Sequence, residues 1–233
     1  MPKILSIETG TSVCSVVLSQ GKQIVALRES VGEPAHAVKL SVFINELLTQ
    51  QNINVADLDA IAVSEGPGSY TGMRIGVSTA KGLCFGAGKP LIAVGSLLSL
   101  AKLGIENAKP AAETLLCPMI DARRMEVYTA LFTANAEMIN QVSAQIIDEN
   151  TYFELLKTHK IIFFGDGAEK CKSVINSPNA IFAAVKASAK GMIDVATEKF
   201  KNSDFVDIAY FEPFYLKDFV VTTSKKKIFL KRL

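Results

Sequence analysis

Tryptophan is absent from this chain of 233 residues, and histidine occurs only twice, at His36 and His159. A metal-binding helix needs a second histidine one turn after the first, but Leu40 stands at that position after His36. A zinc site built on histidine is therefore not expected. We expect His36 to lie at the edge of the hydrophobic core.

Cysteine is scarce and scattered, and no two cysteines form a CxxC pair. This spacing disfavours a zinc ribbon or a disulfide framework. We expect buried free thiols in a reducing cytoplasm. The four cysteines are Cys14, Cys84, Cys117 and Cys171.

An excess of charge of one sign and a long apolar run are also missing. The formal net charge is +2, so nothing indicates nucleic-acid binding by the whole surface. The most apolar long window, residues 82–104, is interrupted by Lys89, Pro90 and Lys102, which argues against a membrane span. Met1 is followed at once by a strand-like run and not by a secretion signal. We expect a cytoplasmic protein.

What the sequence does contain is a strand and helix pattern that occurs twice. In the first part, three apolar runs predict a meander of strands, and helices then alternate with single strands. The predicted strands are 4–7, 13–19, 23–28, 60–64 and 91–94, and the predicted helices are 34–51, 69–88 and 96–106.

A polar stretch, residues 107–114, separates this part from a similar second one. The predicted strands there are 115–121, 125–132, 141–147 and 160–164, and the predicted helices are 149–157, 168–175 and 187–200. We therefore expect an α/β protein with two related halves, residues 1–106 and 107–233, whose last segment returns to the first half.

The predicted helix 69–88 is unusual because it contains four glycines, each of which costs about 1 kcal/mol relative to alanine. Ser69 is positioned to cap its first turn. Small residues on one face would let another backbone approach closely. The residues on or beside this face are Gly72, Gly76, Thr79, Gly82, Leu83 and Gly86.

The predicted helix 34–51 has an apolar face and a second face without charge. Leu40, Ile44 and Leu47 belong to the face expected to pack on the core. Val38, Val42 and Asn45 lie on the opposite face, where a solvated helix would carry Lys or Glu. The missing charge indicates a second buried side.

Two glycine-containing turns are candidates for phosphate contacts. Thr9, Gly10 and Thr11 lie between two strands, where backbone N–H groups and hydroxyls can cradle an anion. Gly165 and Gly167 lie between a strand and a helix, whose N-terminus favours anions. The alternatives are an ordinary hairpin turn and an ordinary strand-to-helix turn.

Three further segments carry charged or nucleophilic groups. Asp121, followed by Arg123 and Arg124, could hold a metal or act as a base beside a phosphate-binding arginine, or could simply form a turn. No motif supplies a histidine that could act as a general base for Ser69, so nucleophilic catalysis by this serine is not expected. The basic tail 224–233 is either a solvated end or a contact for tRNA or an acidic partner.

Several segments together resemble the TsaB (YeaZ) family. The block from Gly66 to Gly76, GPGSYTGMRIG, is the most specific, and the resemblance covers most of the chain. The segments that carry it are Ile4–Val16, His36, Asp57–Gly76, Asp121–Arg123 and Pro213–Lys217.

The resemblance implies an ASKHA fold, that of actin, sugar kinases and heat-shock ATPases. It implies a non-catalytic, cytoplasmic subunit that pairs with the catalytic homologue TsaD and the ATPase TsaE in tRNA threonylcarbamoyladenosine synthesis. It implies no catalytic or metal residues and no required cofactor, with ATP or ADP binding left open, and a homodimer when the chain is alone.

The sequence departs from the superfamily at Glu8, where an aspartate is usual. The alternative function is a free-standing ATP-dependent phosphotransferase or ATPase that would use Glu8 and Asp121 around Mg²⁺. For the TsaB-like function, we expect the partner to contact residues of the two helices. The expected residues are Val38, Val42, Asn45, Gly72, Met73, Gly76, Thr79, Ala80 and Leu83.

Overall fold

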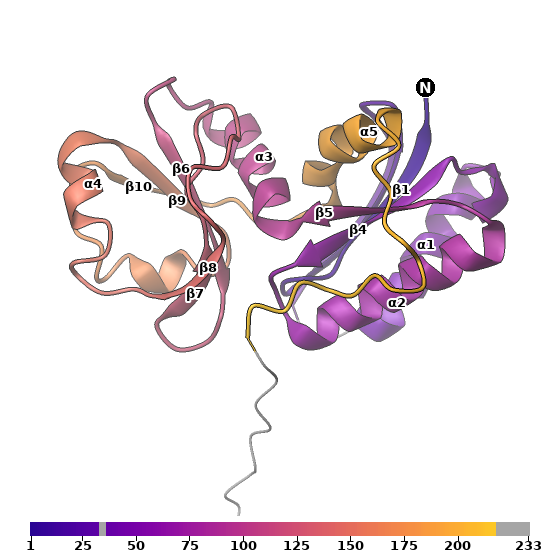
Figure 1. The fold of residues 1–233 in the computed structure, drawn as a ribbon, viewed down its shortest axis with the longest axis horizontal. Helices are drawn as coiled ribbons and strands as arrows, with labels where there is room; N and C mark the ends of the chain where they lie inside the picture. The colour runs from indigo at the N-terminus through magenta and orange to yellow at the C-terminus, as the bar shows by residue number, and fades with distance from the viewer. Residues whose placement is uncertain (33–35, 218–233) are drawn as a thin grey trace, which may run out of the picture.

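The computed structural model describes residues 1–32 and 36–217 and contains two five-stranded sheets (Figure 1). The first sheet has the strand order β3-β2-β1-β4-β5, in which β1, β2 and β3 form an antiparallel meander and β4 and β5 run parallel to β1. The bounds are β1 Lys3–Glu8, β2 Val13–Gln20, β3 Gln23–Val31, β4 Ala60–Gly66 and β5 Leu91–Gly95.

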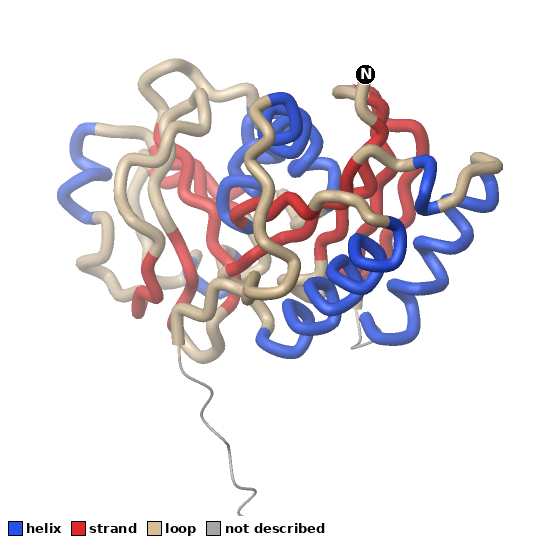
Figure 2. Tube along the Cα trace, turned by 45° about the vertical axis from the view of Figure 1, so that its right-hand side comes forward, coloured by secondary structure: helices blue, strands red, loops and turns tan. Residues whose placement is uncertain are grey.

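Helices cover both faces of the first sheet, as Figure 2 also shows. Helices α1 (His36–Gln50) and α2 (Tyr70–Ala87) pack on one face, with the short helix η1 (Val55–Asp57) beside them. Helix α5 (Ile193–Lys201) and the short helix η3 (Ala189–Met192) pack on the other face. Because helices cover both faces of the first sheet, the strands β1, β4 and β5 are buried on both sides and carry nearly continuous apolar runs.

The second sheet has the order β10-β9-β6-β7-β8, with β9 parallel to β6 and to β10 and with β7 and β8 antiparallel. Helix α3 (Ser96–Ala108) packs on one face, and α4 (Phe153–Thr158) with η2 (Glu169–Cys171) packs on the other. The strand bounds are β6 Leu115–Asp121, β7 Glu126–Thr129, β8 Ser143–Ile146, β9 Ile161–Phe164 and β10 Ala180–Ala183.

The packing of two helices does not follow a simple division of the chain at residue 106. Helix α3 precedes that residue but packs on the second sheet, and α5 follows it but packs on the first. The last described residues, 205–217, which we call the strap, run from α5 past α2 toward β7 (Figure 1). The Val206 N–H donates to the Leu91 carbonyl at 2.9 Å, and the Phe214 N–H to the Glu65 carbonyl at 2.7 Å. The boundary at residue 106 stays a prediction.

Two local predictions were wrong in the second half. The predicted helix 168–175 is instead the single short turn η2, because only a few of its residues, Cys171 and Ile175 among them, reach the core, too few to support a longer helix. Strand β10 was not predicted, since it has only four residues at a sheet edge. The cysteines are free and buried, as expected.

Candidate functional site

The outer side of the α1–α2 pair carries exposed apolar side chains. The two helices lie side by side on the sheet (Figure 1). Val38 is 71% exposed, Val42 46% and Phe85 85%. Exposed apolar side chains on neighbouring helices mark an interaction surface better than scattered single residues do.

The glycines of α2 divide into two groups with different roles. A Cβ on Gly72 would lie 2.0 Å from the Thr9 carbonyl oxygen, and a Cβ on Gly76 would lie 2.2 Å from Thr9 Oγ1. A Cβ on Gly82 or Gly86 would meet nothing within 4 Å. The first two glycines therefore admit the chain's own β1–β2 turn, and only the last two are open to a partner.

Four of the residues predicted to contact a partner are buried within this chain itself. Gly72 and Gly76 are buried against Thr9, and Met73 and Ala80 are 1% and 0% exposed in the core. The small-residue face was assigned correctly as a close-packing surface, but its first half packs against the same chain.

The remaining predicted residues lie where a partner can reach them. Val38, Val42 and Asn45 are exposed on α1, and Thr79 and Leu83 are partly exposed on α2. Phe85, which sequence reasoning missed, lies between the open Gly82 and Gly86. Its position between two glycines without core contacts was the available clue. We call Val38, Val42, Asn45, Thr79, Gly82, Leu83, Phe85 and Gly86 the helical face.

The predicted phosphate-contacting turn between β1 and β2 makes internal contacts. Thr9 Oγ1 donates to the Gly72 carbonyl at 2.8 Å, and Thr11 Oγ1 accepts from the Val13 N–H at 3.2 Å. The Gly10 N–H donates to Glu8 Oε1 at 2.6 Å, and the Gly10 carbonyl accepts from the Ser69 N–H at 2.6 Å. This turn thus fixes the start of α2 to the end of β1.

The second glycine turn, after β9, also serves close packing. Gly165 has a φ of 103°, and a Cβ there would lie 2.2 Å from the Met119 carbonyl oxygen. A Cβ on Gly167 would lie 3.0 Å from the Ile120 carbonyl carbon. Both glycines let this turn cross β6 closely. Phosphate binding at either turn stays a prediction.

Two carboxyls, the buried Glu8 and the exposed Asp166, lie at the ends of β1 and β9. Burial raises the pKa of Glu8 to about 7, against the smaller opposing effect of the Gly10 N–H. Partial desolvation raises the pKa of Asp166, whose Oδ1 accepts from the Asp121 N–H at 3.0 Å. Glu8 favours the neutral form because water does not reach it.

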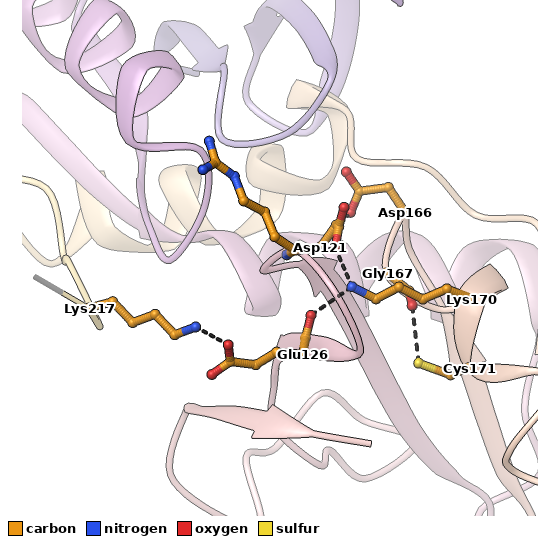
Figure 3. Close-up of polar contacts among 8 residues, drawn as sticks. Asp121, Glu126, Asp166, Gly167, Lys170, Cys171 and Lys217 are labelled. Atoms are coloured by element: carbon orange, nitrogen blue, oxygen red, sulfur yellow. Dashed lines mark hydrogen bonds and ion pairs between the residues drawn. The ribbon is translucent and has the colours of Figure 1, made fainter. Parts of the chain in front are cut away.

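Asp121 forms an ion pair with a lysine of the same chain. The Lys170 ammonium forms an ion pair with the Asp121 carboxylate and donates to the Glu126 carbonyl at 2.7 Å (Figure 3). Among residues 1–32 and 36–217, no cluster of three or more His, Cys, Asp or Glu side chains is arranged to hold a metal ion.

Ser69 caps α2, as predicted, by accepting from the Gly72 N–H at 3.3 Å. The side chain of His36 and the basic tail 224–233 lie outside the part of the chain that the structure describes. Within that part, no helix combines the length and apolarity needed to cross a membrane.

Two α/β halves built around five-stranded sheets define a protein of the actin-like ASKHA superfamily. The structure resembles YeaZ from Pseudomonas aeruginosa with a TM-score of 0.79 at 25% identity, covering 93% of this chain and 100% of that one. A second P. aeruginosa structure, described as an uncharacterized protein with similarity to peptidase YEAZ, gives a TM-score of 0.81 over the same shares of the two chains.

Sequence comparison leads to a particular family. The chain is 32% identical over 178 residues to the tRNA threonylcarbamoyladenosine biosynthesis protein TsaB of Bacillus subtilis, covering 74% of each chain. It is 27% identical over 223 residues to TsaB of Escherichia coli, covering 93% of this chain and 95% of that one. The family model described as TsaD, tRNA N6-adenosine threonylcarbamoyltransferase, matches residues 30–228. The chain belongs to the TsaB family of tRNA threonylcarbamoyladenosine biosynthesis proteins.

Proposed function

We propose that this chain is a cytoplasmic, non-catalytic subunit of a tRNA threonylcarbamoyl transferase assembly, which pairs with a TsaD-like catalytic subunit and a TsaE-like ATPase. The names of its relatives support the pathway, and the helical face supports the role. The observation that carries the proposal is the exposure of three apolar side chains, Val38, Val42 and Phe85, on two adjacent helices.

The helical face has the chemistry of a helix-packing surface. Full burial of an apolar side chain contributes about 1.5–3 kcal/mol relative to exposure, so three exposed apolar residues can supply much of the energy of a specific interface. Open Gly82 and Gly86 let a partner backbone come close to α2. Two helices from the partner would form a four-helix contact with α1 and α2.

The same face gives the isolated chain a means of pairing with itself. An isologous dimer uses one patch on both copies, and the helical face is apolar enough to be self-complementary. Homodimer formation in the absence of the catalytic subunit is therefore part of the proposal.

The carboxyls near the turns support a scaffold over the phosphotransferase alternative. Glu8 is enclosed and accepts from the Gly10 N–H, and Asp121 is paired with Lys170. A phosphotransferase needs acidic groups that are ionised and open to Mg²⁺. We therefore expect negligible ATP turnover by the purified chain with Mg²⁺, and tRNA modification only after the catalytic partner is added.

The test is the double variant Val42→Glu/Phe85→Glu, titrated into the TsaD-like subunit of the same organism by calorimetry. We expect at least a tenfold loss of affinity, because two charges would be buried in an apolar contact. Ile146→Glu is the control, since Ile146 is 71% exposed, between the values for Val42 and Phe85, but lies on β8 of the second half. Equal affinity of the double variant and the unmodified chain would contradict the proposal.

A further inference from the structure

The β6–β7 turn presents two arginines in a conformation that arginine does not favour. Arg123 and Arg124 are exposed and have φ angles of 72° and 52°. The Ala122 N–H donates to the Glu126 carbonyl at 3.1 Å, which closes the hairpin. Positive φ favours glycine and asparagine over arginine, so the backbone conformation of this turn does not explain two arginines.

The charges of these arginines are not balanced within the described chain. Two carboxylates beside the turn have other cations: Asp121 is paired with Lys170, and Glu126 with Lys217 (Figure 3). One further carboxylate, Asp166, accepts from the Asp121 N–H, so it balances at most one of the two arginines. No ion pair formed among residues 1–32 and 36–217 includes Arg123 or Arg124. The tip of the hairpin therefore carries a surplus of positive charge.

The ion pair between Lys217 and Glu126 brings the end of the strap to this hairpin. Two residues earlier in the strap, Tyr215 packs on Tyr70, with ring centroids 4.9 Å apart and an interplanar angle of 37°. The Arg74 guanidinium lies 4.8 Å from the Tyr70 ring centroid. Tyr215 remains 37% exposed. Tyr215, packed on Tyr70, thus lies two residues before the lysine that contacts the hairpin.

We propose that Arg123, Arg124 and Tyr215 form a contact surface for a single-stranded RNA segment. Guanidinium groups bind phosphates, and a part-exposed tyrosine accepts a stacked base, which is the combination that single-strand binders use. The inference rests on the proposed function, because the RNA would belong to the tRNA on which the assembly acts. An acidic protein would use the arginines but would not need the ring.

The test measures binding of a fluorescein-labelled 17-nucleotide RNA stem-loop to the full chain by fluorescence anisotropy at several salt concentrations. The double variant Arg123→Asn/Arg124→Gly removes both charges and installs residues that adopt positive φ readily, so the turn conformation is preserved. We expect about tenfold weaker binding and a salt slope smaller by about 1.4, as for two lost phosphate contacts on a single strand. Tyr215→Leu should weaken binding about tenfold with little change in salt slope.

The matched control is Lys109→Gly/Lys160→Asn, which also removes two exposed positive charges. Lys109 has a φ of 45° that glycine tolerates, and Lys160 lies just before β9, at the opposite end of the parallel strands β6 and β9 from the hairpin. This control should bind RNA as the unmodified chain does. Equal weakening in both double variants would overturn the proposal, because binding would then follow net charge alone.

Three further outcomes would overturn the inference. The first is the absence of saturable binding by the unmodified chain up to about 100 µM, the weak limit of non-specific binding. The second is unchanged RNA binding by the Tyr215→Leu variant. The third is competition by polyglutamate that is as strong as competition by unlabelled RNA. Association of the same variants with the catalytic subunit is measured in parallel. Lost RNA binding with retained association supports the inference, whereas absent association in the unmodified chain would refute the proposed function instead.

Discussion

The carbonyl oxygen of Thr9 lies 2.0 Å from the point where a Cβ on Gly72 would stand. The hydroxyl of the same threonine donates to the Gly72 carbonyl, so the β1–β2 turn and α2 are joined at their closest approach. This contact places α2 on the first sheet and thereby sets the orientation of the helical face.

Two alanine substitutions in α2 should have opposite effects on stability. Gly72→Ala should lower the free energy of unfolding by about 3 kcal/mol or more, because Cβ would overlap the Thr9 backbone. Gly82→Ala should raise it by up to about 1 kcal/mol, since the site is open and alanine favours helix. Urea unfolding followed by circular dichroism measures both. Equal effects of the two substitutions would contradict the division of the glycines.

Stability should fall as the pH rises toward neutrality, in part because of Glu8. Its pKa is raised from 4.5 to about 7 by burial, so the folded chain holds the proton that the unfolded chain releases. The contribution is complete below pH 4.5 and is lost as the pH rises through 7, a change of up to about 3 kcal/mol. Glu8→Gln keeps an acceptor for the Gly10 N–H and removes the ionisation.

The variant should therefore gain stability relative to the unmodified chain as the pH rises from 4.5 to 8. Denaturant midpoints across this range provide the measurement. A constant difference between the two proteins would show that Glu8 does not titrate in this window.

Removal of the Lys170 ammonium should destabilise the hairpin between β6 and β7. The side chain of Lys170 is 23% exposed and joins Asp121 to the Glu126 carbonyl. Lys170→Met should lower the free energy of unfolding by about 1–3 kcal/mol, because the Asp121 charge loses its partner. Lys157→Met removes a well-exposed ion pair with Glu154 and should change it by less than about 1 kcal/mol. Thermal unfolding of both variants compares the two sites.

The thiols of the native chain should react slowly with a thiol reagent at pH 8. Burial raises the pKa of Cys84 to about 12 and the pKa of Cys14 to about 11, so little thiolate forms. Reaction should become rapid and complete in denaturant. Fast reaction of the folded chain in a spectrophotometric assay would show that a cysteine is accessible.

Much of the fold was predictable because local patterns dominate it. The apolar arc through Leu40, Ile44 and Leu47 fixed the core face of α1, and all three side chains are buried. Ser69 and the glycines after it marked the start of α2 in the same way. By contrast, α3 packs on the second sheet, which no local pattern indicates, since an apolar helix face does not specify which sheet will cover it.

The candidate site was only partly predictable for a related reason. The glycines of α2 are alike in sequence, and only Thr9 and the open space beyond Gly82 distinguish them. The exposure of Phe85 and the positive φ of Arg124 could not be read from the sequence, because exposure and backbone conformation are properties of the folded chain.

The order and period of apolar residues by themselves determined the α/β class, the capped helix α2 and its need for close packing, because these depend on neighbours within a few positions. Tertiary structure alone decided which glycines face the chain's own backbone, that the Glu8 carboxyl loses water, and which arginines have no ion pair among the described residues. Those properties arise between segments far apart in sequence, where packing and desolvation act only after the halves have come together.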